Sequence, residues 1–201
     1  MSSDFTISES QIDCLRELAN MGAGKATTSL SLLLDDEKVL MDVPEVVVVP
    51  LKEVTDYIEA EKHVAAVFFE VKSDCLDMMI LFILNYESAE KIVKKVLGND
   101  AGLEEKIGRS TLLEVGNIVN TSYFNALSEV TGTTLVPGRP GIAFDMGGAI
   151  LGTVFSETMM VDDYLILSLT DITTENDNLK GKIFVFPYQG SLQRLCDSMG
   201  V

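Results

Sequence analysis

The sequence repeats itself over a distance of about half its 201 residues. A shift of 97 residues aligns five pairs of identical residues: Leu15 with Leu112, Glu17 with Glu114, Asn20 with Asn117, Leu30 with Leu127 and Ser31 with Ser128. A shift of 102 residues aligns three further pairs: Phe82 with Phe184, Tyr86 with Tyr188 and Gly98 with Gly200. An internal duplication of this kind predicts two copies of one structural unit that bury a common core.

Each half has the pattern helix, strands, helix. Apolar residues at spacings of three and four predict helices over 8–34, 88–97, 109–130 and 191–199. Apolar and β-branched runs predict strands over 38–43, 46–49, 64–71, 76–84, 142–155, 163–170 and 182–187, with a hairpin loop at 170–177. We therefore expect a pseudo-two-fold α/β protein whose strands share one core beneath the long helices. It would be a single domain over 1–201, with pseudo-repeats at about 8–98 and 105–200.

The composition excludes several kinds of partner and site. The formal net charge is −16, so nucleic acid and anionic membranes would repel the chain. The longest apolar runs are roughly eight residues, too short to span a bilayer, and residues 1–5 lack the features of a signal peptide. Cys14, Cys75 and Cys196 have no metal-binding or redox spacing, and the single histidine, His63, lies in a polar stretch. We expect a cytoplasmic protein with free thiols.

One side of each long helix is polar in both copies. At about 100° per residue the apolar positions gather on one side, and three polar positions point away from them. These positions hold Asp13, Glu17 and Asn20 in the first copy and Ser110, Glu114 and Asn117 in the second. A single Glu-x-x-Asn match would be typical of a solvated helix face. Two matches at one offset, inside a repeat that has otherwise diverged, indicate a functional surface.

A carboxylate beside a carboxamide can perform only certain chemistry. No neighbouring base makes either group a nucleophile, and an asparagine cannot act as a general base. A carboxamide can orient a water by accepting and donating hydrogen bonds, and a carboxylate can bind a lysine ammonium. The pair fits phosphoryl hydrolysis, in which positioning and electrostatics dominate. A metal site built on Asp13 and Glu17 is the alternative, which the absence of a neighbouring histidine in the sequence disfavours.

The segment Gly22-Ala-Gly24-Lys25 resembles a phosphate-binding loop only superficially. That pattern requires glycine at Ala19 and Ser or Thr at Ala26, and it follows a strand rather than lying within a helix. We therefore reject nucleotide binding. The two glycines are predicted to permit close backbone packing, at a cost in helix propensity of about 1 kcal/mol each.

The two polar motifs resemble the signature of the CheC/CheX/FliY family of chemotaxis phosphatases. The matching patterns are Asp13-x3-Glu17-x2-Asn20 in the first half and Ser110-x3-Glu114-x2-Asn117-x22-Pro140 in the second. The stretches 17–24 and 43–50 are most similar to the CheC branch. In the first half Pro44 follows Asn20 after 23 residues rather than 22, a one-residue insertion. The resemblance covers nearly the whole chain, including its duplicated layout.

This resemblance implies a fold and an activity. The fold would be the CheC-like one, α/β (α+β) and pseudo-two-fold, with a largely antiparallel sheet and two long motif-bearing helices. The activity would be hydrolysis of the aspartyl phosphate of the response regulator CheY. Each glutamate of the motifs, Glu17 and Glu114, would engage a lysine of the regulator, and each asparagine, Asn20 and Asn117, would align a water for in-line attack. The supporting residues would be Asp13, Ser110, Pro44 and Pro140.

The resemblance also implies partners. Family members bind the receptor deamidase CheD, and residues 144–151 are similar to the segment that contacts it, with Asp145 the matching residue. Mg²⁺ would belong to the regulator, so this chain would hold no metal or other cofactor of its own. Two intact motifs permit a monomer or a heterodimer with CheD. The alternative interpretation is a non-catalytic adaptor that regulates CheD and has weak auxiliary phosphatase activity.

Overall fold

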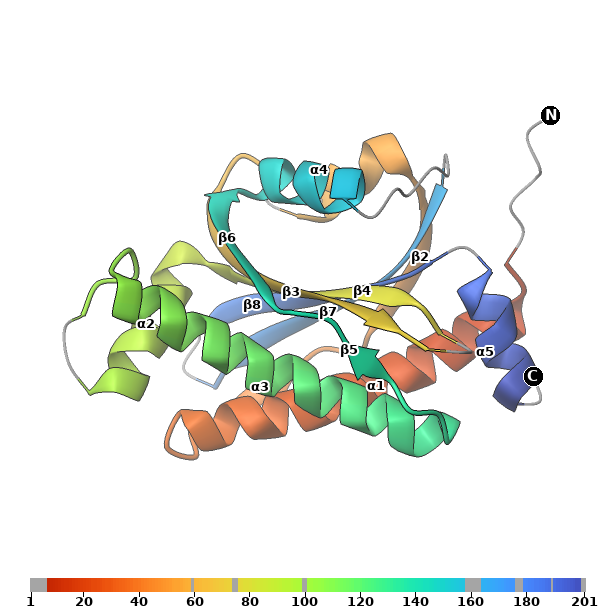
Figure 1. The fold of residues 1–201 in the computed structure, drawn as a ribbon, viewed down its shortest axis with the longest axis horizontal. Coiled ribbons are helices and arrows are strands. Elements are labelled where there is room, and N and C mark those ends of the chain that lie inside the picture. The colour runs from red at the N-terminus through yellow and green to blue at the C-terminus, as the bar shows by residue number, and fades with distance from the viewer. Residues whose placement is uncertain are drawn as a thin grey trace.

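A single curved sheet lies between two layers of helices (Figure 1). The structure is a computed structural model, and it describes residues 7–58, 60–73, 76–98, 101–157, 164–175, 179–188 and 190–199. The helices are α1 (Glu9–Leu33), η1 (Leu51–Tyr57, a 3-10 helix), α2 (Tyr86–Leu97), α3 (Lys106–Thr131), α4 (Gly147–Glu157) and α5 (Ser191–Met199). The strands are β1 (Val39–Met41), β2 (Glu45–Pro50), β3 (His63–Lys72), β4 (Met78–Asn85), β5 (Val136–Pro137), β6 (Gly141–Met146), β7 (Tyr164–Thr174) and β8 (Lys180–Pro187).

The two halves of the chain exchange strands within this sheet. The strand order is β1–β7–β8–β4–β3–β5, with β2 also pairing β7 and β6 also pairing β3. Thus β2 of the first half extends the second half, and β6 of the second half extends the first. The central seam is the pairing of β4 with β8. All the pairings in the described chain are antiparallel, which confirms the predicted pseudo-two-fold, largely antiparallel fold.

The sheet has a hydrophobic core on each face. On one face α1 and α3 cross in opposite directions, with α2 and α5 at the flanks (Figure 1), and they cover one large apolar cluster. On the other face β2 and β6 curl upward, and α4 and η1 cover a second cluster built around Leu81, Phe184 and Phe186. The prediction of one core beneath the long helices was therefore wrong, because it omitted the second helix layer.

The strand register corrects the predicted alignment of the two halves. The shift of 102 places Phe82 on Phe184, but Phe82 packs beneath the long helices and Phe184 packs on the opposite face. A slip of one residue moves a strand side chain to the other face of its sheet, so an odd shift is required for these strands. The identical phenylalanines are therefore not structural equivalents.

Shifts of 96 for β2 and 101 for β7 satisfy both face and register. The pair Glu45–Leu169 then maps onto the observed pair Gly141–Phe68, since 45 plus 96 is 141 and 169 minus 101 is 68. The shift therefore changes by five residues in the chain segment that connects these strands. In this segment the second half has α4, with 11 residues, and the first half has η1, with 7. The two halves therefore differ most in the helices over the second core.

The predicted strand over 142–155 was wrong beyond its first residues. β6 ends at Met146 and α4 begins at Gly147. Ile150, Leu151, Val154 and Phe155 are all buried on one side of this helix, against the second core. A short apolar run does not distinguish a buried helix from a buried strand by its periodicity.

The predicted hairpin loop over 170–177 was wrong in its first part, because β7 continues to Thr174. Residues 176–178 lie outside the described chain.

Several helix boundaries coincide with local capping signals in the sequence. Ser8 and Gln11 form a complete capping box at the start of α1, each side chain bonding the backbone N–H of the other residue. Gly98 ends α2 in the left-handed conformation, with φ of 64°. The second long helix starts at Lys106, three residues before the predicted boundary.

Within the described residues, none of the helices combines the length and apolar character needed to traverse a bilayer.

Candidate functional site

The two Glu/Asn motifs lie on the outer side of the helix layer, away from the sheet. Glu17, Asn20 and Glu114 are exposed, and Asn117 is partly exposed. On the opposite side of the same two helices, facing the sheet, Leu15, Leu18, Leu112 and Val115 are buried. Within the described part of the chain, the four motif side chains have no hydrogen-bond or ion-pair partner. They are therefore accessible to a second molecule.

The motifs lie at opposite ends of the crossing between α1 and α3. The crossing is marked by contact of Gly22 with Tyr123 and by a hydrogen bond of 2.7 Å between the hydroxyls of Ser29 and Ser122. Both motifs precede the crossing in their own helix, and the helices run in opposite directions (Figure 1). At 1.5 Å per residue, the glutamates are separated by roughly 20 Å along the helices. The molecule thus has two distinct candidate sites rather than one composite site.

Only one of the two glycines in α1 is needed for close packing. A Cβ at Gly22 would lie 2.6 Å from the ring of Tyr123, whereas a Cβ at Gly24 would have nothing within 4 Å. The prediction of close packing was therefore correct for Gly22 and wrong for Gly24. Gly22 lets α1 approach α3 closely enough to hold both motifs on one helix layer.

The predicted supporting residues have different environments. Asp13 is exposed and forms an ion pair of 2.6 Å with Arg16, whereas Ser110 is exposed and neutral. Pro44 is buried directly before β2, and Pro140 is half-buried directly before β6. Arg16 was not among the predicted site residues. Its signal was present in the sequence as an Asp and an Arg three residues apart on a helix, a spacing that permits an ion pair.

Asp145 lies on a different surface from the two motifs. It is exposed in β6, which rises away from the α1–α3 layer toward α4 (Figure 1). Its carboxylate accepts a hydrogen bond of 2.7 Å from the backbone N–H of Met146. Behind it lies a cavity of about 110 Å³, lined mainly by apolar side chains from β6 and α4. Met146 at the end of β6 is 46% exposed, so this surface presents apolar area next to a carboxylate.

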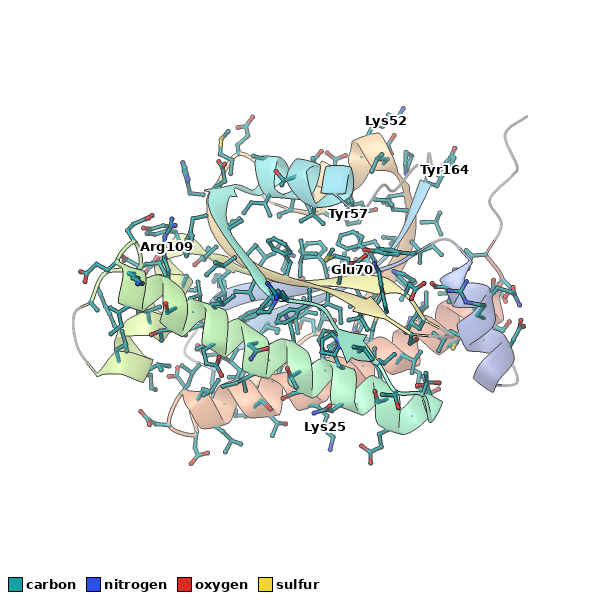
Figure 2. The ribbon with its side chains drawn as sticks, in the orientation of Figure 1. Lys25, Lys52, Tyr57, Glu70, Arg109 and Tyr164 are labelled. Atoms are coloured by element: carbon teal, nitrogen blue, oxygen red, sulfur yellow. The ribbon has the colours of Figure 1, made fainter. Side chains whose placement is uncertain are left out.

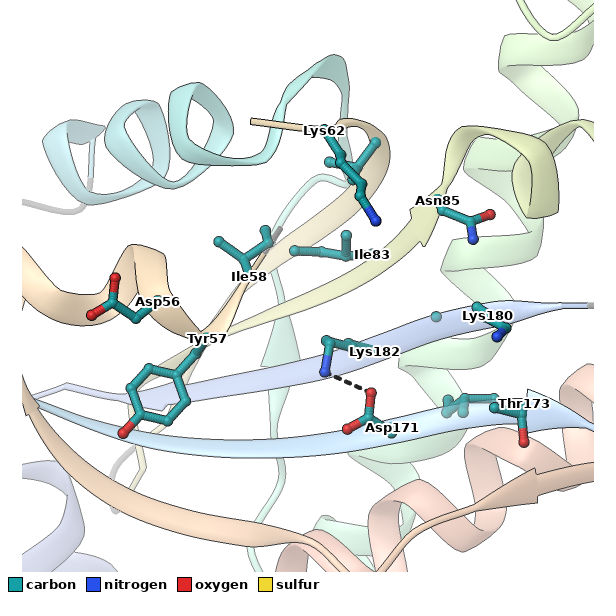
Figure 3. A pocket seen from close by; sticks show the side chains of 13 residues that line it. Asp56, Tyr57, Ile58, Lys62, Ile83, Asn85, Asp171, Thr173, Lys180 and Lys182 are labelled. Carbon is teal, nitrogen blue, oxygen red and sulfur yellow. Dashed lines mark hydrogen bonds and ion pairs between the residues drawn. The ribbon is translucent and has the colours of Figure 1, made fainter. Parts of the chain in front are cut away.

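A cavity of about 710 Å³ lies on the face of the sheet opposite the motifs (Figure 3). Its wall includes Lys62, Lys180 and Lys182, and Lys182 forms an ion pair of 2.6 Å with Asp171. None of the predicted site residues lines it, and its described lining has neither histidine nor cysteine. The duplicated motif does not reach this cavity, so we place the candidate chemistry at the helix motifs instead.

The remaining reactive side chains do not form a second candidate site. Cys14 and Cys196 are buried free thiols, and burial raises the pKa of Cys14 to about 12, so neither is an activated nucleophile. His63 is exposed at the start of β3, and Cys75 lies outside the described residues. Among the described residues, no group of three or more His, Cys, Asp or Glu is arranged to hold a metal ion.

Comparison by sequence finds similarity to chemotaxis proteins. The model of the CheC-like family matches residues 11–48, which include the motif on α1, β1 and Pro44. The CheY-P phosphatase CheC of Bacillus subtilis (strain 168) is 32% identical over 203 residues, and the alignment covers 96% of each chain.

Comparison by structure finds the same fold in three related groups of proteins. FliY of Thermotoga maritima superposes with a TM-score of 0.74 at 18% identity, covering 98% of each chain. The FliM middle domain of H. pylori gives 0.65 at 14% identity, covering 96% of this chain and 100% of that one. CheX in the CheX–CheY–BeF3–Mg+2 complex of Borrelia burgdorferi gives 0.58 at 13% identity, covering 87% and 99%. At these identities the likeness concerns the fold alone.

Proposed function

The chain belongs to the CheC-like family, and on that premise we propose that it hydrolyses the aspartyl phosphate of a CheY-type response regulator. The observation that carries the proposal is the duplicated Glu/Asn motif, exposed on both long helices. The similar protein of B. subtilis is named a CheY-P phosphatase, and a CheX relative of the same fold has been solved with CheY. Both comparisons support a regulator of this type as the substrate.

The proposed reaction uses the two side chains of each motif in different roles. The carboxylate of Glu17 or Glu114 binds a lysine ammonium of the regulator and so fixes the orientation of the complex. The carboxamide of Asn20 or Asn117 accepts from and donates to one water, holding it in line with the phosphorus. Attack by this water breaks the bond between phosphorus and the aspartyl oxygen, which leaves a free carboxylate and inorganic phosphate.

The proposal assigns Mg²⁺ to the regulator rather than to this chain. Each motif offers one glutamate, and in α1 the carboxylate of Asp13 is already paired with Arg16. A divalent ion usually requires several oxygen ligands, which one glutamate and one carboxamide do not provide. On this proposal the chain contributes only positioning and electrostatics, and it acts as a monomer or as a heterodimer with CheD.

The decisive experiment replaces both asparagines. A CheY-type regulator is phosphorylated with a small phosphodonor, and release of inorganic phosphate is followed with and without the protein. The variant Asn20→Ala plus Asn117→Ala should lose the acceleration, because loss of water alignment costs on the order of 10²-fold. Each single variant should keep the activity of the other site.

The matched control is Asn125→Ala. Asn125 is exposed on the same side of α3 as the motif but outside it, so this substitution should leave the rate unchanged. If the double variant cleared the phosphorylated regulator at the rate of the unmodified protein, the proposed roles would be wrong.

We propose CheD binding as a second function, located at Asp145. Its support is the exposed carboxylate beside the apolar surface of β6 and α4, on a different surface from the motifs. Asp145→Lys should abolish capture of CheD in a pull-down and leave phosphate release intact. Undiminished capture would reject this surface. The adaptor alternative would be favoured if CheD bound tightly while the unmodified protein failed to accelerate phosphate release.

A further inference from the structure

The two motifs differ in the residues one helical turn before them. Side chains four residues apart in a helix lie next to each other on one face. In α1 the residues four before Glu17 and Asn20 are Asp13 and Arg16. In α3 the corresponding positions hold Ser110 and Leu113. We call Asp13 with Arg16 the charged rim, and Ser110 with Leu113 the neutral rim.

The charged rim is open to a docking partner. The guanidinium of Arg16 donates to the carboxylate of Asp13 at 2.6 Å, and the two side chains are 44% and 72% exposed. A side-chain pair this exposed can exchange its internal contact for contacts with another protein. Arginine is well suited to this, because its planar group can bind carboxylates and phosphates through two parallel hydrogen bonds.

The neutral rim has no comparable charge. Leu113 is half-buried and packs against the large core, and Ser110 is an exposed hydroxyl. The adjacent cation, Arg109, points about 140° around the helix from Glu114. Its guanidinium contacts Glu104 at 3.3 Å and lies 4.6 Å from the centre of the Phe144 ring. It is therefore held on another side of α3.

We propose that the two sites recognise the regulator by different physical means, with Arg16 and Asp13 as specificity-determining residues of the site on α1. This inference rests on the proposed function. The charged rim forms exposed ion pairs with the regulator, and the neutral rim makes only van der Waals and neutral hydrogen-bond contacts. Both sites keep the contribution of their glutamate, and the rims are the difference in charge within the helical turn directly before the motifs. Exposed ion pairs are screened by salt, so salt weakens the site on α1 more.

The test measures each site separately as a function of salt. Asn117→Ala leaves the site on α1 active, and Asn20→Ala leaves the site on α3 active. Between about 50 and 500 mM NaCl, kcat/KM of the Asn117→Ala variant should fall about threefold more than that of the Asn20→Ala variant. The larger fall should come from a rise in KM, while kcat of the two variants responds to salt alike. Equal salt dependence of the two variants would overturn the inference while leaving the proposed function intact.

A charge-neutral exchange identifies the residues responsible. Adding Asp13→Ser and Arg16→Leu to the Asn117→Ala variant gives α1 the neutral rim and keeps the net charge constant. Its salt dependence should then match that of the Asn20→Ala variant. The control replaces Lys52 and Glu53 by serine, because this exposed ion pair on η1 lies on the opposite face of the sheet (Figure 2 labels Lys52). This control variant, made in the Asn117→Ala background, should keep the steeper dependence of kcat/KM on salt.

The two levels of the proposal fail in different ways. If neither single-site variant accelerates phosphate release, the proposed function fails and no salt dependence can be measured. If both accelerate it and the rim exchange leaves the steep slope unchanged, the rim residues are wrongly assigned. Arg16→Gln alone repeats the test should the exchanged variant lose thermal stability.

Discussion

Cys14 and Cys196 meet between α1 and α5, one turn before the motif on α1. Their thiols are hydrogen-bonded to each other, and three residues earlier in each helix Gln11 donates to Gln193 at 2.8 Å. Burial, followed by the neighbouring Cys196 and Glu17, raises the pKa of Cys14 to about 12. The two thiols therefore remain protonated at neutral pH and act as small packing groups rather than as reactive ones.

The raised pKa of Cys14 predicts that stability falls in alkali. An ordinary thiol in the unfolded chain ionises near pH 9.0, whereas the folded chain keeps this proton to about pH 12. The contribution to the free energy of unfolding is therefore complete below pH 9 and is lost as pH rises toward 12. Burial also raises the pKa of Tyr123, which acts in the same direction at higher pH.

Urea unfolding at a series of pH values between about 8 and 11 tests this expectation. The free energy of unfolding should decline above pH 9, and Cys14→Ala should flatten the first part of the decline. A free energy that stays constant over this range in the unmodified protein would contradict it.

At the scale of elements, the packing of α1 on α3 depends on one glycine. Gly22→Ala should lower the free energy of unfolding by about 1–3 kcal/mol, because the added methyl group collides with the buried ring of Tyr123. Gly24→Ala adds the same methyl group to open space two residues away and should raise stability by up to about 1 kcal/mol through helix propensity. Chemical denaturation measures both, and effects of the same sign would refute the assignment.

The elements that were predictable from sequence are those with local signals. The capping box at Ser8 and the glycine at the end of α2 act within one helical turn, so the chain itself specifies them. The helix α4 was missed because its apolar residues are buried by a layer formed from distant segments. The match of Phe82 with Phe184 failed for a related reason, since identity carries no information about which face of a sheet a residue occupies.

The candidate site was predictable in part for the same reason. Exposure of the Glu/Asn motifs follows from the helical period, which is a local property. Their separation at opposite ends of a helix crossing depends on how α1 meets α3, and Gly22 together with Tyr123 sets that contact across about 100 residues. The buried carboxamide of Asn120 was also unpredictable. It replaces Ala23 of the first copy and has no hydrogen-bond partner among the described residues.

At the scale of the whole molecule, the exchange of edge strands joins the two halves. β2 pairs with β7 over Glu45–Pro50, β6 pairs with β3, and β4 pairs with β8 through seven residue pairs at the seam. Neither half can therefore complete its sheet alone. The pseudo-dyad that results places one motif at each end of the helix crossing, so the geometry of both sites depends on the integrity of the same sheet.

This interlocking predicts that the chain unfolds in a single cooperative transition, as one domain. If either half opened first, the other would expose the backbone groups of its own inner strand, β3 or β7, to water at once. Native-state hydrogen exchange in increasing denaturant should therefore give β3 and β7 the same free energy of opening, equal to that from global unfolding. The short strand β5 has one exchangeable amide, that of Val136, because Pro137 has no backbone N–H; this amide serves as an internal comparison and should exchange with a lower free energy of opening. Protection that persists in β3 and β4 after β7 and β8 have exchanged would instead mean that the halves fold independently, and that the two sites can lose activity separately.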